Sequence, residues 1–148
     1  MVIDPPDPWP RPAVSSAIFR GEQLLLVLRA RPPYAGRWSL PGGRIKPGEG
    51  AREAALRELF EETGVTAQIS GLAEIVDVIH TPKGVLSTHY VISVFFGTWL
   101  AGEPLAASDA ADARFVPLRE LADLSMTEGA ASVIAKAWRL ASCAVVAP

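Results

Sequence analysis

The amino-acid sequence predicts an α/β fold in which helices cover both faces of a mixed β-sheet. Three observations support this prediction. Apolar residues make up 49% of the 148 positions, which is enough for a buried core. Short apolar runs that suit strands alternate irregularly with helix-like stretches. Residues 89–96 are almost continuously apolar or aromatic, which favours a central strand covered on both sides.

The length fits one domain, which we place at residues 12–148. Residues 1–11 contain four prolines, so this segment cannot be helical. We expect it to be an extended N-terminal arm that lies on the domain or on a partner.

Glycine and proline divide the first part of the chain into short elements. In order, we expect a hairpin of strands at 14–19 and 24–28, a loop at 30–37, a brief strand at 38–40 that Pro41-Gly42-Gly43 breaks, and a helix at about 50–63. Gly64 follows this helix directly, in the position where glycine commonly ends a helix.

The second part of the chain is richer in strands. In order, we expect β-rich stretches at 66–80 and 87–99 around a turn at 81–84, a loop at 101–112, a short strand at 114–117, a short helix at 118–124 and a longer helix at 128–142.

Charge and composition exclude several classes of protein. The net charge is −2 and no block of like charge stands out, so neither a nucleic acid polymer nor a membrane surface is an expected partner. No apolar run of 18 residues could span a membrane, and the acidic, proline-rich start is unlike a signal peptide. Cys143 is the single cysteine and has no internal disulfide partner. We therefore expect a cytoplasmic protein.

Acidic residues gather on the predicted helix. Glu58, Glu61 and Glu62 stand at i, i+3 and i+4, so they share one face. Ala51 and Ala54 fall on the same arc, which leaves this face uncrowded. The opposite side, which we expect to face the core, carries Leu56, Leu59 and Phe60.

Three neighbouring carboxylates repel one another and raise each other's affinity for protons. Arg57 is the one basic residue close to them, so a divalent cation would relieve the repulsion. Mg²⁺ and Mn²⁺ prefer carboxylate oxygens, also bind phosphate oxygens, and activate an attacking water. Glu49, just before the helix, could add another oxygen. For Glu-Leu-Phe-Glu-Glu alone, a solvated acidic helix is about equally plausible.

The longer stretch from Gly43 to Val65, GRIKPGEGAREAALRELFEETGV, resembles the Nudix box. That box runs Gly, five residues, Glu, seven residues, Arg-Glu-aliphatic, one residue, Glu-Glu, one residue, Gly-aliphatic. Every fixed position is filled here, by Gly43, Glu49, Arg57, Glu58, Leu59, Glu61, Glu62, Gly64 and Val65. The preceding Trp38–Gly43 and the late Arg114–Leu118 also resemble segments of this family.

The resemblance implies a Nudix-type α/β/α sandwich and a hydrolase that cuts a phosphoanhydride bond in a small nucleotide. It implies Mg²⁺ or Mn²⁺ as cofactor, held by Glu58, Glu61 and Glu62 with help from Gly43 and Glu49. The same three glutamates and Arg57 would be the catalytic residues, and which glutamate acts as the base stays open. Homodimers are common in the family, so a homodimer is possible here.

Four residues outside the box are candidate substrate contacts. Arg29 and Arg31 follow a predicted strand, and their planar guanidinium groups suit phosphate, although solvated arginines fit equally well. Tyr34 could stack on a base. Some family members take a base or ligand from a late loop, where Asp109 is favoured over Glu103 and Asp112.

A nucleoside diphosphate linked to another group, such as ADP-ribose, is the favoured substrate, ahead of an oxidised or ordinary nucleoside triphosphate. Some ADP-ribose hydrolases of the family carry a proline at a set distance beyond the box, and Pro82 lies close to that register. The short chain and the Trp38 segment resemble the triphosphate-cleaning members instead. The main alternative is a nucleotide-binding or sensing module without turnover, which would not need three crowded glutamates. A Nudix-fold isomerase would need a catalytic cysteine near the box, and Cys143 lies far along the chain.

Overall fold

The computed structural model describes residues 9–32 and 34–146, and a seven-stranded sheet lies at its centre. Five strands follow one path in the order β3 (Trp38–Ser39), β2 (Gln23–Arg29), β1 (Arg11–Arg20), β6 (Thr88–Ala101) and β5 (Thr66–His80). Off this path, β4 (Gly42–Arg44) pairs with β1, and β7 (Ala110–Pro117) pairs with β2. β1 and β6 are parallel, whereas β1 and β2 are antiparallel, so the sheet is mixed as predicted.

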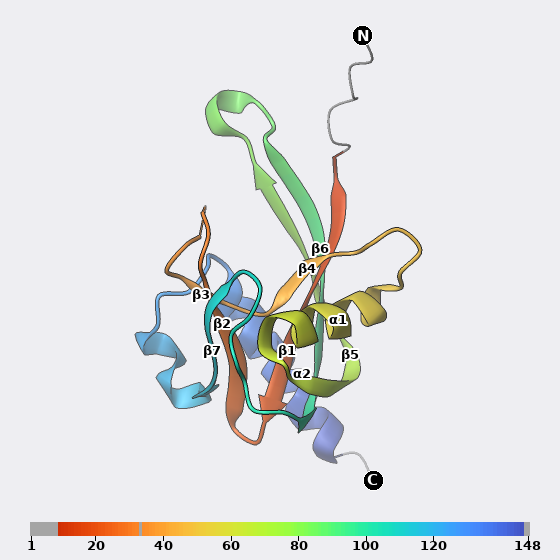
Figure 1. Ribbon diagram of the computed structural model, residues 1–148, viewed down its shortest axis with the longest axis vertical. Coiled ribbons are helices and arrows are strands. Elements are labelled where there is room, and N and C mark those ends of the chain that lie inside the picture. The colour runs from red at the N-terminus through yellow and green to blue at the C-terminus, as the bar shows by residue number, and fades with distance from the viewer. Residues whose placement is uncertain (1–8, 33, 147–148) are drawn as a thin grey trace.

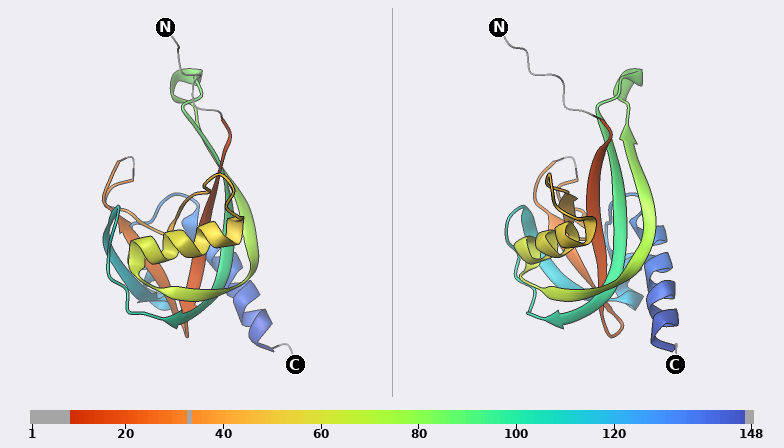
Figure 2. Two further views of the ribbon diagram at one scale, coloured as in Figure 1. Left: turned by 45° about the vertical axis from the view of Figure 1, so that its right-hand side comes forward. Right: turned by 90° about the vertical axis from the view of Figure 1, so that its right-hand side faces the viewer.

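The two α-helices cover opposite faces of the sheet (Figures 1 and 2). Successive residues of a strand point to opposite faces, and β1 shows the result. Ile18 packs with Leu59 of α1 (Ala51–Thr63), whereas its neighbour Ala17 belongs to the core that includes Ile134 of α2 (Ala130–Val146). The predicted α/β/α sandwich is therefore confirmed.

The first predicted hairpin and the predicted helix are confirmed. β1 and β2 form the hairpin, and both strands are longer than the apolar runs that predicted them. Gly64 ends α1 with φ 72°, and its amide donates a hydrogen bond of 2.9 Å to the carbonyl oxygen of Phe60. Glycine reaches this left-handed conformation without the strain that a Cβ would add.

The predicted break after the brief strand is confirmed, because β3 ends at Ser39, but the two glycines of Pro41-Gly42-Gly43 are themselves in a strand. They form part of β4, in which Gly42 pairs with Ser15 and Gly43 pairs with Val14 of β1. A Cβ at Gly42 would collide with the carbonyl oxygen of Val14. Here glycine permits the close approach of two backbones, which is a known reason for glycine inside a strand.

The predicted faces of α1 are wrong in part. Leu59 is buried as expected, but Leu56 is 37% exposed and Phe60 is 58% exposed. Ala54 and Ala55 are buried instead. Their small side chains let α1 lie close to the sheet, and the buried stripe therefore runs along the alanines. The acidic face and the buried face overlap rather than stand opposite each other.

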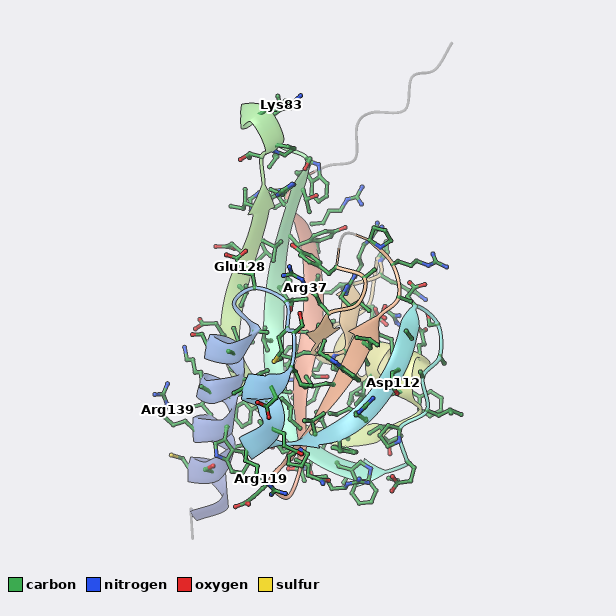
Figure 3. The ribbon with its side chains drawn as sticks, turned by 90° about the vertical axis from the view of Figure 1, so that its left-hand side faces the viewer. Arg37, Lys83, Asp112, Arg119, Glu128 and Arg139 are labelled. Atoms are coloured by element: carbon green, nitrogen blue, oxygen red, sulfur yellow. The ribbon has the colours of Figure 1, made fainter. Side chains whose placement is uncertain are left out.

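β5 and β6 form a long antiparallel hairpin whose outer half projects from the body of the molecule (Figure 1). The predicted turn at 81–84 is confirmed at its tip, where η1 (Pro82–Gly84) lies and Figure 3 labels Lys83. Val94–Gly97 is buried, but Thr88–Ser93 is half-buried. The predicted double cover of this strand is therefore wrong for its outer half, which extends past both helices.

The late elements follow the prediction with shifted boundaries. β7 begins at Ala110, so the predicted loop is shorter, and Asp112 already lies on this strand (Figure 3). The predicted short helix is a 3₁₀ helix, η2 (Leu118–Asp123), and α2 follows it.

The first strand starts at Arg11, the last residue of the predicted arm. Residues 1–8 of that arm lie outside the described residues. In the part of the chain that the structure describes, no helix is long and apolar enough to cross a membrane.

Candidate functional site

α1 and the loop before it bring the glutamates of the box together against one face of the sheet. Their environments differ. The side chain of Glu58 is 17% exposed, whereas that of Glu61 is 45% exposed. Glu62 lies closest to the sheet, where the backbone amide of Gly42 donates a hydrogen bond of 3.4 Å to its Oε1. The shared helix face therefore presents one exposed and two largely buried carboxylates.

Arg57 links the loop to the helix. Its Nε and Nη2 donate to the two carboxylate oxygens of Glu49, at 2.6 and 2.9 Å. Its Nη1 donates to Glu58 at 2.9 Å and to Glu61 at 3.2 Å. Nη2 also donates to the carbonyl oxygen of Arg44 at 3.0 Å. Such bidentate, charge-assisted bonds fix geometry as well as charge, so Arg57 orders the loop around Glu49 and holds two glutamates of the helix.

The hydrogen bonds and charges of this network shift the pKa values of Glu49 and Arg57. The hydrogen bonds from Arg57 and from the backbone of Lys46 lower the pKa of Glu49 to about 2. Bonding to Glu49 and Glu58 in turn raises the pKa of Arg57 above its ordinary value. Glu49 and Arg57 are therefore both charged at neutral pH.

Glu62 is shifted in the opposite direction. Burial and the negative charge of Glu58 raise the pKa of Glu62 from 4.5 to about 8, although the positive charge of Arg29 opposes this. Glu62 therefore holds its proton at neutral pH, because it is buried beside the charge of Glu58 without enough positive charge nearby to balance both. A divalent cation between them would supply that charge.

The side chains at this site have the chemistry that a hard divalent cation requires. Glu58 and Glu62 offer oxygen ligands of the kind that Mg²⁺ and Mn²⁺ prefer. Among the described residues, however, no three acidic, histidine or cysteine side chains form a ready metal-binding group. Glu61 contacts Arg57 here, so it would have to turn toward the other two glutamates to join them.

Gly43 is packed directly against Glu58. A Cβ at Gly43 would lie 2.5 Å from Oε1 of that glutamate, so any side chain would displace the carboxylate. The box glycine is therefore required by packing on the glutamate.

Gly43→Ala is expected to lower kcat at least about tenfold, because displacing the carboxylate of Glu58 should cost more in catalysis than in stability. Steady-state kinetics and thermal melts measure the two effects. Gly50→Ala is the matched control, since its Cβ would meet Glu53 at an ordinary 3.6 Å. Equal kcat values for the two variants would contradict the required close packing.

The candidate substrate contacts form two pairs near the end of β2. The guanidinium carbon of Arg29 lies 5.9 Å from the centre of the Tyr34 ring. Arg31 and Asp109 form an exposed ion pair of 3.2 Å, and the amide of Ala30 donates to the carbonyl oxygen of Asp109. Of the four, Arg29 is also close enough to Glu62 to affect its pKa. The other two late acids pair elsewhere, Glu103 with Arg20 and Asp112 with Arg114.

Some residues of this region were not predicted from the sequence. The amide of Gly42 and the carbonyl of Arg44 contact the glutamates or Arg57 through backbone atoms, for which a sequence carries no side-chain signal. Ser39 could have been identified, because strand alternation places it on the face opposite that of Trp38. Ser16 could be placed only once the register of β1 was known.

Comparison with known proteins places this geometry in a family. Residues 9–137 match the family described as the NUDIX domain. A relative from Methanocaldococcus jannaschii, named "ADP-ribose pyrophosphatase", is 34% identical over 78% of this chain and 67% of its own length. A relative from Bacillus subtilis, named "Putative 8-oxo-dGTP diphosphatase", is 42% identical over 57% of this chain and 50% of its own length.

Solved structures agree with the sequence comparison. A MutT NUDIX hydrolase from Burkholderia pseudomallei superposes with a TM-score of 0.77 at 29% identity, covering 87% of this chain and 98% of that one. The chain spans only about half the length of the Bacillus subtilis relative, so shared activity does not follow from that match. The family match over most of the chain and the relatives' names lead to one conclusion: this chain belongs to the Nudix family and is a Nudix hydrolase.

Proposed function

We propose that this Nudix hydrolase cleaves the phosphoanhydride bond of a nucleoside diphosphate linked to a second group, with Mg²⁺ or Mn²⁺ as cofactor. The observation that carries the proposal is the pair of Glu58 and Glu62, in which burial and the charge of Glu58 raise the pKa of Glu62 to about 8. A structural role alone gives no reason to bury two such carboxylates side by side.

The residues of the box take different roles in this proposal. Glu58, Glu61 and Glu62 would hold the cation, with help from the backbone of Gly43. Arg57 holds Glu58 and Glu61 by hydrogen bonds and keeps the loop of Glu49 in place. When bound, the cation would neutralise the diphosphate and lower the pKa of an attacking water.

Arg29 is the best-supported substrate contact. Its Nε is buried and has no hydrogen-bond partner, and a phosphate oxygen would satisfy it. Tyr34 is 37% exposed and lies beside Arg29, so its ring is available to stack on a base. Arg31 and Asp109 are both exposed, so their side chains are accessible to a bound substrate.

We favour an ADP-ribose-like substrate over an oxidised or ordinary nucleoside triphosphate. The relative named for ADP-ribose matches 78% of the chain, whereas the one named for 8-oxo-dGTP matches 57%. Pro82 no longer supports this preference. It lies in η1 at the tip of the projecting hairpin, where it acts as a turn proline.

Activity is expected to require a divalent cation. Excess EDTA should lower turnover to background, and Mg²⁺ or Mn²⁺ added beyond the chelator should restore it. The reason is that the cation would neutralise the diphosphate and lower the pKa of the attacking water. The measurement is product release by chromatography before and after each addition. Full turnover in EDTA would contradict the proposal.

The substrate preference is tested by comparing kcat/KM for ADP-ribose and 8-oxo-dGTP at the same metal concentration. Cleavage of ADP-ribose gives AMP and ribose 5-phosphate, whereas cleavage of the triphosphate to a monophosphate gives pyrophosphate. A clear advantage for 8-oxo-dGTP with pyrophosphate as product would reverse the preference and leave the metal-dependent hydrolysis standing. The possible homodimer stays a prediction, which sedimentation analysis of the same samples would check.

A further inference from the structure

Three buried polar side-chain atoms among the described residues have no hydrogen-bond partner. They are Oγ of Ser16, Nε of Arg29 and Oγ of Ser39. Ser16 is 1% exposed and Ser39 is 8% exposed. Folded proteins generally avoid such unpaired groups, so each calls for a partner or a role. Arg29 already has a proposed partner in the substrate phosphate, whereas the two serines do not.

Both serines lie on the sheet face that α1 covers. On β1, Ser16 stands between Val14 and Ile18, and these two residues pack in the clusters that contain alanines and Leu59 of α1. On β3, Ser39 pairs with Val27, which shares its face with Leu25 of the same α1 cluster.

One short segment connects the serines to Glu62. The carbonyl oxygen of Pro41 accepts a hydrogen bond of 3.1 Å from the amide of Ser16. The next residue, Gly42, donates its amide hydrogen to Oε1 of Glu62. Ser39 stands two residues before Pro41. The two hydroxyls therefore lie in the layer between the sheet and α1, on the side where Glu62 meets the sheet.

We propose that Ser16 and Ser39 are positioning residues for the carboxylate of Glu62 and act on it through ordered water. A buried water needs two to four polar partners, and two hydroxyls with a carboxylate meet that need. Each hydroxyl both donates and accepts, whereas an ionised carboxylate accepts only.

Glu62 needs such support. On the side of the sheet, its carboxylate accepts the 3.4 Å hydrogen bond from the amide of Gly42, which is too long to fix its orientation. Water held by the serines would add donors from the side of the sheet and keep Glu62 directed toward Glu58. This inference rests on the proposed catalytic role of Glu62.

The test compares Ser39→Ala, Ser16→Ala and their double variant with the wild type. We expect each single variant to lower kcat about tenfold with KM changed less than about twofold, because a misdirected carboxylate slows the reaction without removing a substrate contact. Melting temperatures should change little, because alanine keeps the surrounding packing and removes a hydroxyl whose only proposed partner is water. The double variant should lose less than the product of the two single effects, because both serines hold the same water.

Two controls separate positioning from packing. Ser39→Thr keeps a hydroxyl and should restore most of the lost kcat. Ser15→Ala changes the neighbour of Ser16 on the opposite face of β1 and should keep wild-type kcat.

The outcomes distinguish this inference from the proposed function. Kinetics use ADP-ribose, or 8-oxo-dGTP if that is the better substrate, in saturating Mn²⁺. If the wild type is active and both alanine variants match Ser15→Ala in kcat, the positioning role is wrong and the proposed function stands. If the alanine variants lose kcat and melting temperature together, the serines have a structural role and the positioning role is wrong. If the wild type cleaves neither nucleotide, both proposals fail.

Discussion

Glu62→Gln is expected to lower kcat at least about a hundredfold while the protein stays folded. Glutamine keeps the size of the side chain and one carbonyl oxygen that can accept the hydrogen bond from the amide of Gly42. It lacks the negative charge with which the carboxylate binds a cation or accepts a proton. Glu58→Gln should have a similar effect, because the two carboxylates act as a pair. Kinetics in saturating Mn²⁺ measure both.

Glu53→Gln is the matched control on the same helix. Glu53 is exposed in the first turn of α1 and has no hydrogen bond to Arg57 among the contacts of the described residues. This variant should keep kcat within about twofold, as exposed substitutions usually do. If Glu62→Gln retained as much activity as Glu53→Gln, Glu62 would have no catalytic role.

Without metal, Glu62→Gln is expected to stabilise the protein at alkaline pH. The folded-state pKa of about 8 is above the ordinary 4.5, so the folded wild type loses stability as the pH rises from about 5 to 9. Glutamine cannot ionise and avoids this loss. We expect a gain of about 1–3 kcal/mol at pH 9 and little change at pH 5. Chemical denaturation in EDTA at both pH values measures it, and a gain that is equal at both would contradict the titration of Glu62.

Leu59→Ala is expected to lower the free energy of unfolding by about 2–5 kcal/mol. Leu59 is 1% exposed and packs with Ile18, Leu25 and Val65 between α1 and the sheet. Alanine would leave a cavity there that the surrounding strands cannot close. The melting temperature should fall by roughly 5–15 °C, and kcat per folded molecule should change little at low temperature.

Phe60→Ala is the control for this substitution, and it also tests which face of α1 is buried. Phe60 follows Leu59 directly but is 58% exposed, so its truncation should cost less than about 1 kcal/mol. If Phe60→Ala destabilised the protein as much as Leu59→Ala, α1 would be rotated relative to the sheet.

Local signals in the sequence predicted much of the fold. Gly64 marked the end of α1 because glycine reaches the left-handed conformation without strain, which is a local property that the sequence carries. The hairpin around residue 21 and the turn at 81–84 were predicted for the same reason. In contrast, the exposure of Leu56 and Phe60 depends on how closely Ala54 and Ala55 let the helix approach the sheet. That distance is set by tertiary packing, which helix periodicity does not contain.

The site divides in the same way. The helical spacing predicted that Glu58, Glu61 and Glu62 share one face with Arg57 close by, and Arg57 does contact Glu58 and Glu61. Their catalytic roles stay predictions. The hydroxyls of Ser16 and Ser39 were not predicted as a pair, because their common position depends on the pairing of β1 with β2 and of β2 with β3.

The parallel pairing of β1 with β6 has a consequence for how the chain folds. Arg11 lies opposite Tyr90 and Phe19 opposite Thr98, so each partner is 79 residues away in sequence. Pairing over such a separation requires closure of a long loop, and its entropic cost slows folding. During synthesis, the opposite edge of β1 can pair with β4 as soon as residue 44 is available, with Ala13 opposite Arg44. The other edge waits until β6 has been made, so an N-terminal fragment that ends before residue 88 would expose the middle of the sheet and tend to aggregate.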